Sequence, residues 1–237
     1  MESIFIFGLA IALGYFVLPR LLSLKTLHFF LGHATSFEAA WRDRFFRPLT
    51  MRMMSVSPNL VSIFGFVLIL FLLYLFSVDA PVEVIFVLVL LAGFTDMLDG
   101  PLARNNNRVT KTGAVLDWTR DLSLALAVGY FLFDREFLEF EILVWFFLGW
   151  VLLGILRVFE LRIGNGGMLN LDRDYKFILD RIRLAVVWIG VLFLLLMPYN
   201  ISLGRVGENL VIASIAISWF SLLFHAAHLR ILRKERV

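Results

Sequence analysis

Six long apolar stretches constrain the fold of this chain more than any other feature of its sequence. They run near residues 59–78, 82–103, 113–133, 140–157, 184–198 and 208–229. Each is close to the roughly 17–25 residues that a helix needs to cross a bilayer. In a helix the backbone N–H and C=O groups bond to one another, and this is required in a bilayer because hydrocarbon offers them no hydrogen-bond partners. The sequence therefore predicts an all-α integral membrane protein with a six-transmembrane-helix bundle.

The composition agrees with a lipid environment. Hydrophobic residues make up 60% of the chain and charged residues 17%, with a mean hydropathy of +0.87. Soluble domains usually hold about 45–50% apolar and about 25% charged residues. The net charge of +3 is too small to indicate a nucleic-acid partner. The chain has no cysteine, which excludes disulfides and thiolate metal sites.

Basic residues gather in alternate loops of the predicted bundle. They precede the first stretch, separate the second from the third and the fourth from the fifth, and follow the sixth. The remaining loops are mostly acidic. Because cytoplasmic loops carry the excess of Lys and Arg, both ends of the bundle are expected in the cytoplasm, together with the loop after residue 103. We expect the protein in the inner (plasma) membrane of the cell, with its active site facing the cytoplasm.

The first 57 residues are expected to form a region of their own. Residues 3–18 are apolar but short, and they form either an extra helix or a segment packed against the bundle. From 20 to 54, apolar residues mix with Arg, Lys and His, which is typical of helices in the membrane interface. We therefore expect a hydrophobic segment and cytoplasmic interfacial helices over 1–57, and a six-helix domain over 58–237.

Four aspartates interrupt the second and third apolar stretches. A carboxylate near the middle of a membrane helix costs about 2.5–3.5 kcal/mol on insertion scales, so four of them need compensation. Asp96 and Asp99 are three residues apart and Asp117 and Asp121 four apart, so each pair shares one helix face. Two facing helix ends would bring four hard oxygen ligands together. This arrangement indicates a site for divalent cations such as magnesium.

Two other interpretations of the aspartates stay open at this point. They could form a structural ion-pair cluster with Arg104, Arg108 or Arg120. They could also bind the coupling ion of an ion-coupled membrane transporter with an intramembrane carboxylate site. Transporters of that kind usually have paired repeats and sites near the bilayer midplane, whereas this chain has no internal repeat.

The residues around the aspartates resemble the signature of a known family. The pattern Asp-x2-Asp-Gly-x2-Ala-Arg-x8-Gly-x3-Asp-x3-Asp is present in full over 96–121. It is similar to that of the CDP-alcohol phosphotransferases, also called CDP-alcohol phosphatidyltransferases. The resemblance implies a phospholipid-biosynthesis enzyme that moves a phosphatidyl group from CDP-diacylglycerol, or a similar CDP-linked lipid, to an alcohol and releases CMP. Similar proteins are commonly homodimers.

The resemblance also implies roles for single residues. Two divalent cations, Mg or Mn, would be held by Asp96, Asp99, Asp117 and Asp121. Asp121 would in addition act as the general base toward the acceptor hydroxyl. The pocket for cytidine and diphosphate would be lined by Gly100, Ala103, Arg104 and Gly113.

The acceptor is less clearly indicated. Residues 107–113 are similar to members that use glycerol 3-phosphate or phosphatidylglycerol, so glycerol 3-phosphate or a related polar alcohol is expected. Those members carry small residues before the fourth aspartate and Ala-Asp-Lys around it, where this chain has Trp118, Thr119, Arg120 and Leu122. Candidates for binding an acceptor phosphate are Arg157, Arg181 and Arg183. The other interpretation of these arginines is cytoplasmic positive charge alone.

Overall fold

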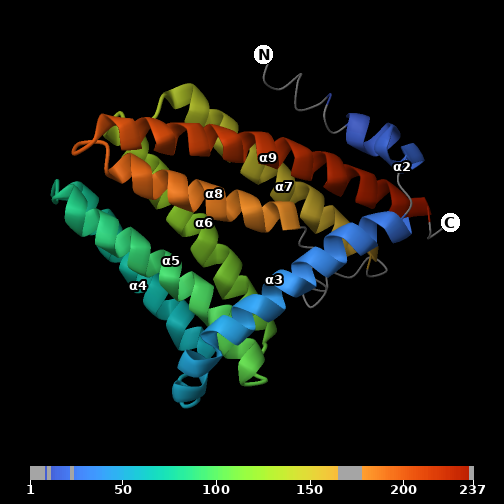
Figure 1. The fold of residues 1–237 in the computed structure, drawn as a ribbon, viewed down its shortest axis with the longest axis horizontal. Helices are drawn as coiled ribbons and strands as arrows, with labels where there is room; N and C mark the ends of the chain where they lie inside the picture. The colour runs from blue at the N-terminus through green and yellow to red at the C-terminus, as the bar shows by residue number, and fades with distance from the viewer. Residues whose placement is uncertain (1–8, 10–11, 22–23, 165–177, 235–237) are drawn as a thin grey trace. The chain divides into compact units, whose positions relative to one another are not determined.

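The computed structural model describes residues 9, 12–21, 24–164 and 178–234, and every regular element in them is a helix. In chain order the helices are α2 (Leu18–Leu21), α3 (Leu24–Arg52), α4 (Pro58–Ser77), α5 (Val82–Asn105), α6 (Lys111–Asp134), α7 (Phe140–Gly164), α8 (Ile178–Leu195) and α9 (Ile201–Lys234) (Figure 1). The predicted all-α fold is confirmed.

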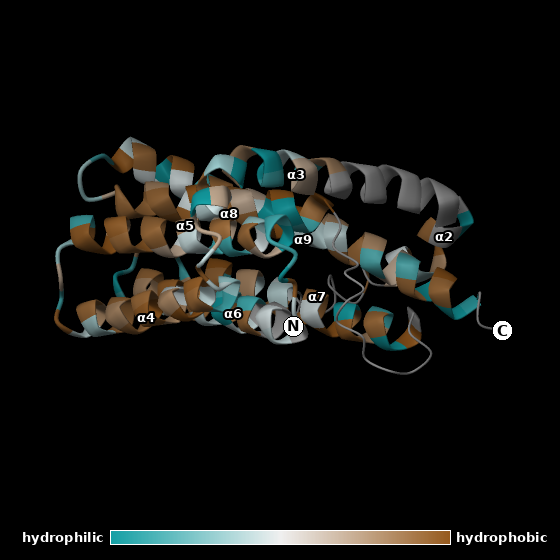
Figure 2. Cartoon of the chain, turned by 90° about the horizontal axis from the view of Figure 1, so that it is seen from below, coloured by the Kyte–Doolittle hydropathy of each residue, from teal (hydrophilic) through white to brown (hydrophobic). Residues whose placement is uncertain are grey.

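Each of the six predicted apolar stretches overlaps a helix of its own, from α4 to α9, although the stretch at 184–198 continues past the end of α8 at Leu195. Among the described residues, three segments are long and apolar enough to cross a membrane: Pro58–Ser77, Phe140–Ile163 and Ile201–Lys234. Figure 2 shows hydrophobic residues along almost the whole of α4. The chain thus has membrane-spanning helices, and the number of six crossings stays a prediction.

The chain divides into two compact units, each built from separate stretches of sequence. The aspartate unit comprises residues 38–139 and 191–208, and the histidine unit comprises 1–37, 140–190 and 209–237. Both are named after the side chains described below. The boundary predicted between residues 57 and 58 stays a prediction.

In the aspartate unit, α4 packs against both α5 and α6 (Figure 1). Leu72 and Ile85 are fully buried, and the rings of Phe76 and Phe131 stack with centroids 4.4 Å apart. Apolar burial of this kind is the packing that holds α5 and α6 in place. The positions of the carboxylates on these helices follow from it.

The three helices of this unit end in the same way. After α4, α5 and α6 the chain takes a left-handed residue, at Asp79, Asn107 and Glu136, with φ of 51°, 54° and 55°. After α5, for example, the Arg108 N–H donates to the Ala103 carbonyl at 2.8 Å and the Asn107 N–H to the Arg104 carbonyl at 3.1 Å. These two bonds define a Schellman ending, which satisfies carbonyls that have no partner inside the helix.

In the histidine unit, α7 packs against α9 through Leu153, Leu156, Leu222 and Ala226. The N-terminal segment also lies on α9, because a Cβ atom added at Gly14 would come within 2.5 Å of the Leu223 carbonyl oxygen. Only part of the stretch predicted at 3–18 is described, since 1–8 and 10–11 lie outside the described residues. The interfacial segment predicted over 20–54 is helical in α2 and α3, and its position in the membrane interface stays a prediction.

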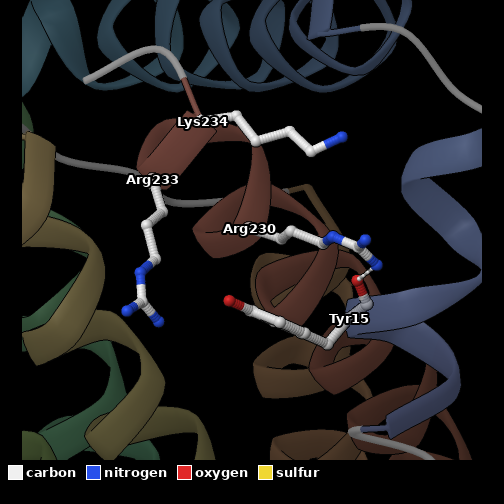
Figure 3. Close-up of a pocket in the computed structure, with 4 residues that line it drawn as sticks. All are labelled: Tyr15, Arg230, Arg233 and Lys234. Atoms are coloured by element: carbon white, nitrogen blue, oxygen red, sulfur yellow. Dashed lines mark hydrogen bonds between the residues drawn. The ribbon is translucent and has the colours of Figure 1, made fainter. Parts of the chain in front are cut away.

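A basic pocket lies at the end of α9 in this unit. Its lining residues are Tyr15, Arg230, Arg233 and Lys234. Arg230 donates to the Tyr15 carbonyl oxygen at 2.7 Å, and its guanidinium lies over the ring, 5.5 Å from the centroid (Figure 3). The contact ties the N-terminal segment to α9.

Candidate functional site

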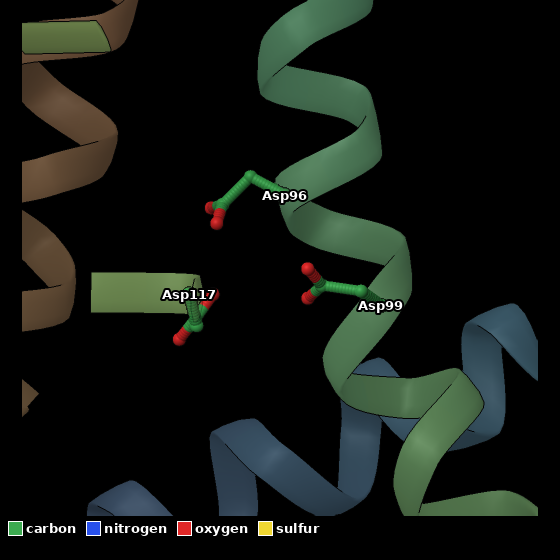
Figure 4. A group of neighbouring side chains, drawn as sticks. All are labelled: Asp96, Asp99 and Asp117. Atoms are coloured by element: carbon green, nitrogen blue, oxygen red, sulfur yellow. The ribbon is translucent and has the colours of Figure 1, made fainter. Parts of the chain in front are cut away.

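The aspartates of α5 and α6 gather at one place, as their spacing predicts. Asp96 and Asp99 project from α5 toward Asp117 of α6 (Figure 4). Carboxylate oxygens of these three residues lie within 4.8 Å of one another. Asp121, one turn further along α6, is not part of this set of three, but a shared guanidinium connects it to the others. The four residues are called the aspartate quartet below.

Neighbouring hydroxyl groups fix the geometry of the quartet. The Ser62 hydroxyl on α4 donates to the Asp99 Oδ2 atom at 2.8 Å. At the start of α6, the Thr110 hydroxyl accepts from the Gly113 N–H at 3.0 Å and caps the helix that carries Asp117 and Asp121. The quartet is therefore held from three helices.

Arg120 lies at the centre of the quartet. Its Nη2 atom donates to Asp96, to Asp117 at 2.8 Å and to Asp121 at 3.4 Å, and its Nη1 atom donates to Asp99. The side chain is only 1% exposed. Of the three arginines that the sequence left open as ion-pair partners, Arg120 pairs with all four aspartates. It is also one of the residues at which the chain departs from the family pattern.

A glycine on α4 makes room for Arg120. A Cβ atom added at Gly65 would lie 2.6 Å from the Arg120 Cδ atom and 3.2 Å from the Thr95 hydroxyl oxygen. Such a distance is shorter than carbon atoms tolerate, so the arginine occupies its place only because residue 65 has no side chain.

The donor set of the quartet fits a divalent cation. The ion pairs of the quartet set four carboxylates against the single guanidinium of Arg120. The side chains of Asp96, Asp117 and Asp121 are 27%, 35% and 31% exposed, which leaves the quartet open on one side. Clustered carboxylate oxygens are the ligands that Mg²⁺ and Mn²⁺ prefer.

Arg104 is held by a residue that the sequence did not single out. Asp43 of α3 accepts from its Nε atom at 2.8 Å and from its Nη2 atom at 2.7 Å, a bidentate pair. The Nη1 atom of Arg104 lies toward Gly100, where an added Cβ would be 3.2 Å away. Arg104 is therefore oriented before any ligand arrives.

The other small residues of the signature lie on the same two helices. Ala103 is one turn beyond Asp99 on α5 and is partly exposed. Gly113 is one turn before Asp117 on α6, and a Cβ atom there would come within 3.1 Å of the Asn59 Oδ1 atom. A side chain at this position would therefore press against the Asn59 side chain of α4.

The histidine unit holds a second group of ionisable side chains, the histidine cluster: Glu160, Asp180, Ser221, His225 and His228. His225 contacts Glu160 Oε2 through Nδ1 at 2.7 Å and Asp180 Oδ2 through Nε2 at 3.1 Å. His228 Nδ1 contacts Glu160 Oε1 at 2.9 Å, and Ser221 donates to Asp180. With both carboxylates ionised, both ring nitrogens of His225 donate, and the imidazole is positively charged.

Arg183, one of the predicted acceptor residues, lies beside this cluster. Its guanidinium is over the Trp150 ring, 5.0 Å from the centroid, and it is attracted by Asp180 and repelled by Arg157. The residue is 7% exposed, and no described residue accepts a hydrogen bond from its Nε or Nη1 atom. Arg157 and Arg181 are half-buried, and both have partners.

Helices long and apolar enough to cross a membrane, together with a carboxylate cluster shared by two adjacent helices, define an integral membrane protein with a candidate site for a metal ion. The chain belongs to the CDP-alcohol phosphatidyltransferase family, whose sequence model matches residues 55–227. Members of this family are transferases that move a phosphatidyl group from a CDP-alcohol to an alcohol acceptor, and they generally use a divalent metal. The resemblance noted in the sequence is thus confirmed.

The chain is also similar to an uncharacterized protein of Aquifex aeolicus (strain VF5). The two are 43% identical over 70 residues, which are 28% of this chain and 34% of that protein. The match thus spans about a third of the relative's length. No solved structure matches the chain.

Proposed function

We propose that this protein transfers a phosphatidyl group from CDP-diacylglycerol to a polar alcohol and releases CMP, as a step of phospholipid biosynthesis. The observation that carries the proposal is the gathering of Asp96, Asp99 and Asp117 on two helices of a family member. The family match favours this function over the ion-coupled transporter, the alternative with the same carboxylates.

In the proposed reaction the acceptor hydroxyl oxygen forms a bond to the phosphorus that carries diacylglycerol. The bond from that phosphorus to the CMP oxygen breaks, and its electron pair leaves with CMP. The hydroxyl proton goes to Asp121, which is partly exposed and lies outside the set of three aspartates. Divalent cations, Mg or Mn, held by the quartet would supply positive charge to the diphosphate.

The donor is proposed to bind along the small residues of α5 and α6. By the resemblance to the family signature, the residues that line this donor site would be Gly100, Ala103 and Gly113. Asp43 accepts hydrogen bonds from the Nε and Nη2 atoms of Arg104, and the remaining Nη1 atom is available to a diphosphate oxygen. The basic loop that follows α5 supports a donor site at the cytoplasmic side of the membrane.

The acceptor is proposed to be glycerol 3-phosphate or a related phosphorylated alcohol. Arg183 supports this choice, because a buried guanidinium with free donor atoms suits a phosphate group. Arg157 adds a second positive charge close to Arg183, and Arg181 is a third candidate.

Purified full-length protein with labelled CDP-diacylglycerol and Mg²⁺ tests the proposal. Glycerol 3-phosphate, inositol phosphate, serine and phosphatidylglycerol are offered in turn, and mass spectrometry identifies the lipid product. We expect CMP release and a phosphatidylglycerol-phosphate product with the first acceptor. Asp117→Asn should abolish both, whereas Asp134→Asn, on the exposed end of the same helix, should not. CMP formation that is equal in the two variants would rule the site out.

A further inference from the structure

The basic pocket at the end of α9 has no part in the proposed reaction. It is a cavity of about 530 Å³, and it is lined by one aromatic side chain, Tyr15, and by the cationic side chains of Arg230, Arg233 and Lys234. Figure 3 shows these four side chains around one opening. Because sites for small ligands usually have volumes of about 300–1,000 Å³, the pocket is large enough for the headgroup of a phospholipid.

The positive charge of this pocket is not balanced by the described residues. No described Asp or Glu forms an ion pair with Arg230, Arg233 or Lys234. The next two residues in the sequence, Glu235 and Arg236, have opposite charges and leave the count unchanged. A helix C-terminus adds only about half a negative charge. The pocket is therefore suited to an anion.

Arg230 is held in place by the N-terminal segment. Its Nη1 atom donates to the Tyr15 carbonyl oxygen at 2.7 Å, and its guanidinium lies 5.5 Å from the Tyr15 ring centroid and 5.2 Å from that of Phe16. The segment itself lies close to α9, since a Cβ atom added at Gly14 would be 2.5 Å from the Leu223 carbonyl oxygen. A guanidinium oriented in this way can bind phosphate oxygens with little further loss of side-chain freedom.

The sequence of α9 indicates the depth of the pocket in the membrane. The helix Ile201–Lys234 is long and apolar enough to cross a bilayer, and its apolar stretch ends near residue 229, directly before Arg230. Its 34 residues correspond to a length of about 51 Å, whereas the hydrocarbon core is about 30 Å thick. The last turn of α9 therefore extends beyond the hydrocarbon to the level of the lipid headgroups.

We propose that the basic pocket binds the phosphate group of an anionic phospholipid of the surrounding bilayer. A soluble phosphate ester has the same phosphate chemistry, but the position at the end of a membrane-spanning helix favours the lipid. An anionic headgroup fits better than a zwitterionic one, which would bring a further cation among three others. The bound lipid would join the N-terminal segment to α9. The proposal does not depend on the transferase reaction, because it uses no residue of the aspartate quartet.

Thermal unfolding of the full-length protein in a neutral detergent tests the proposal, because a ligand that binds only the folded protein raises Tm. Short-chain phosphatidylglycerol is added in steps, and phosphatidylcholine of the same chain length is the zwitterionic reference. We expect Tm to rise with phosphatidylglycerol and to change little with phosphatidylcholine. Inorganic phosphate, compared with sodium chloride at the same ionic strength, is the soluble source of phosphate and should have no such effect.

A double variant, Arg233→Gln with Lys234→Gln, removes two cations of the pocket and keeps the contacts of Arg230. Each basic residue near a membrane surface strengthens binding to anionic lipid roughly fivefold, so the same rise in Tm should require about 30-fold more phosphatidylglycerol. The exchange of the two side chains, Arg233→Lys with Lys234→Arg, keeps both charges and should retain binding. Arg205→Gln removes an exposed cation near the other end of α9 and should behave as the wild type.

Three results would overturn the proposal. The first is a response to phosphatidylglycerol that is as strong in the double glutamine variant as in the wild type. The second is an equal response to phosphatidylglycerol and phosphatidylcholine, since the charge of the pocket would then have no role. The third is an equal rise in Tm with inorganic phosphate, which would assign the pocket to a soluble ligand. Should the double variant not fold, Lys234→Gln alone decides, with an expected change of about fivefold.

Discussion

The aspartate quartet and the histidine cluster are both groups of ionisable side chains in a largely apolar protein, but they differ in charge balance. In the cluster, Glu160 and Asp180 face the His225 imidazole, with Arg183 and Arg157 nearby, so the positive groups at least match the two carboxylates in number. In the quartet, four carboxylates share Arg120. The cluster thus has little uncompensated negative charge, whereas the ion pairs of the quartet set four carboxylates against one guanidinium.

The side chains of the histidine cluster are also less exposed than those of the aspartate quartet. Glu160, His225 and His228 are almost completely inaccessible, while Asp117 and Asp121 keep about a third of their side-chain surface. The comparison teaches that similar residue types serve two purposes in this fold. The cluster joins α7, α8 and α9, whereas the quartet keeps an exposed side. Substitutions in the two regions should therefore affect different measurements.

The largest effect is expected from Asp121→Asn. Removing the proposed general base should lower kcat by about 10²–10⁴-fold. Because Asp121 is outside the set of three close carboxylates, Mn²⁺ binding should persist. Steady-state CMP release and a Mn²⁺ titration on the same preparation check both halves. Loss of metal binding in parallel with kcat would show that Asp121 is a ligand more than a base.

Glu160→Gln should reveal the structural purpose of the histidine cluster. The change removes the carboxylate that contacts both His225 and His228 in a fully buried site, while His225 keeps its contact with Asp180. Breaking a buried ion pair in this way costs about 3–5 kcal/mol. Thermal unfolding in detergent should show a large fall in Tm, whereas Glu141→Gln, exposed on the same helix, should shift it little. An unchanged Tm would contradict the assignment of the cluster to stability.

Arg183→Gln should affect binding of the acceptor and spare the donor. Loss of charged hydrogen bonds worth about 1.5–3 kcal/mol raises KM for a phosphorylated acceptor roughly 10- to 100-fold. KM for CDP-diacylglycerol should stay the same. Arg205→Gln, exposed near the start of α9, serves as the control. Equal changes in the two KM values would instead point to a general structural role for Arg183.

The smallest effect is expected at the start of α6. Thr110→Ala removes the cap on the Gly113 N–H and should destabilise the protein by about 1 kcal/mol. Thr110→Ser keeps the hydroxyl and should restore the wild-type Tm. If the serine variant is as unstable as the alanine variant, the methyl group and not the cap is responsible.

Much of the fold and of the quartet was predictable because both depend on local spacing. The six apolar stretches overlap α4 to α9 one by one, although their bounds differ by several residues at α7, α8 and α9. Asp96 and Asp99 share a face because they are three residues apart in a helix. The convergence of that face with Asp117 required only that α5 and α6 be antiparallel neighbours across a short loop.

The remaining contacts were not predictable, since they join residues that are distant in sequence. The buried position of the Arg120 side chain depends on the missing side chain of Gly65, which lies on another helix. No residue near 120 in the sequence indicates this dependence. The pairing of Glu160 with His225 is of the same kind, because it depends on how α7 lies against α9. The spacing of three residues between His225 and His228 places both on one face of a helix, but their acidic partners lie on other helices.

The bond between Asp43 and Arg104 has a consequence for how this protein can be shortened. The matched family region begins at residue 55, after both Asp43 and Thr50, whose hydroxyl accepts from the Asn105 side chain at 2.9 Å. A chain trimmed to that region would keep every signature residue yet leave the end of α5 without two of its anchors. The shortest chain that keeps these two contacts is therefore longer than the matched family region. A shortened variant has to begin before Asp43, so that it retains the last turns of α3.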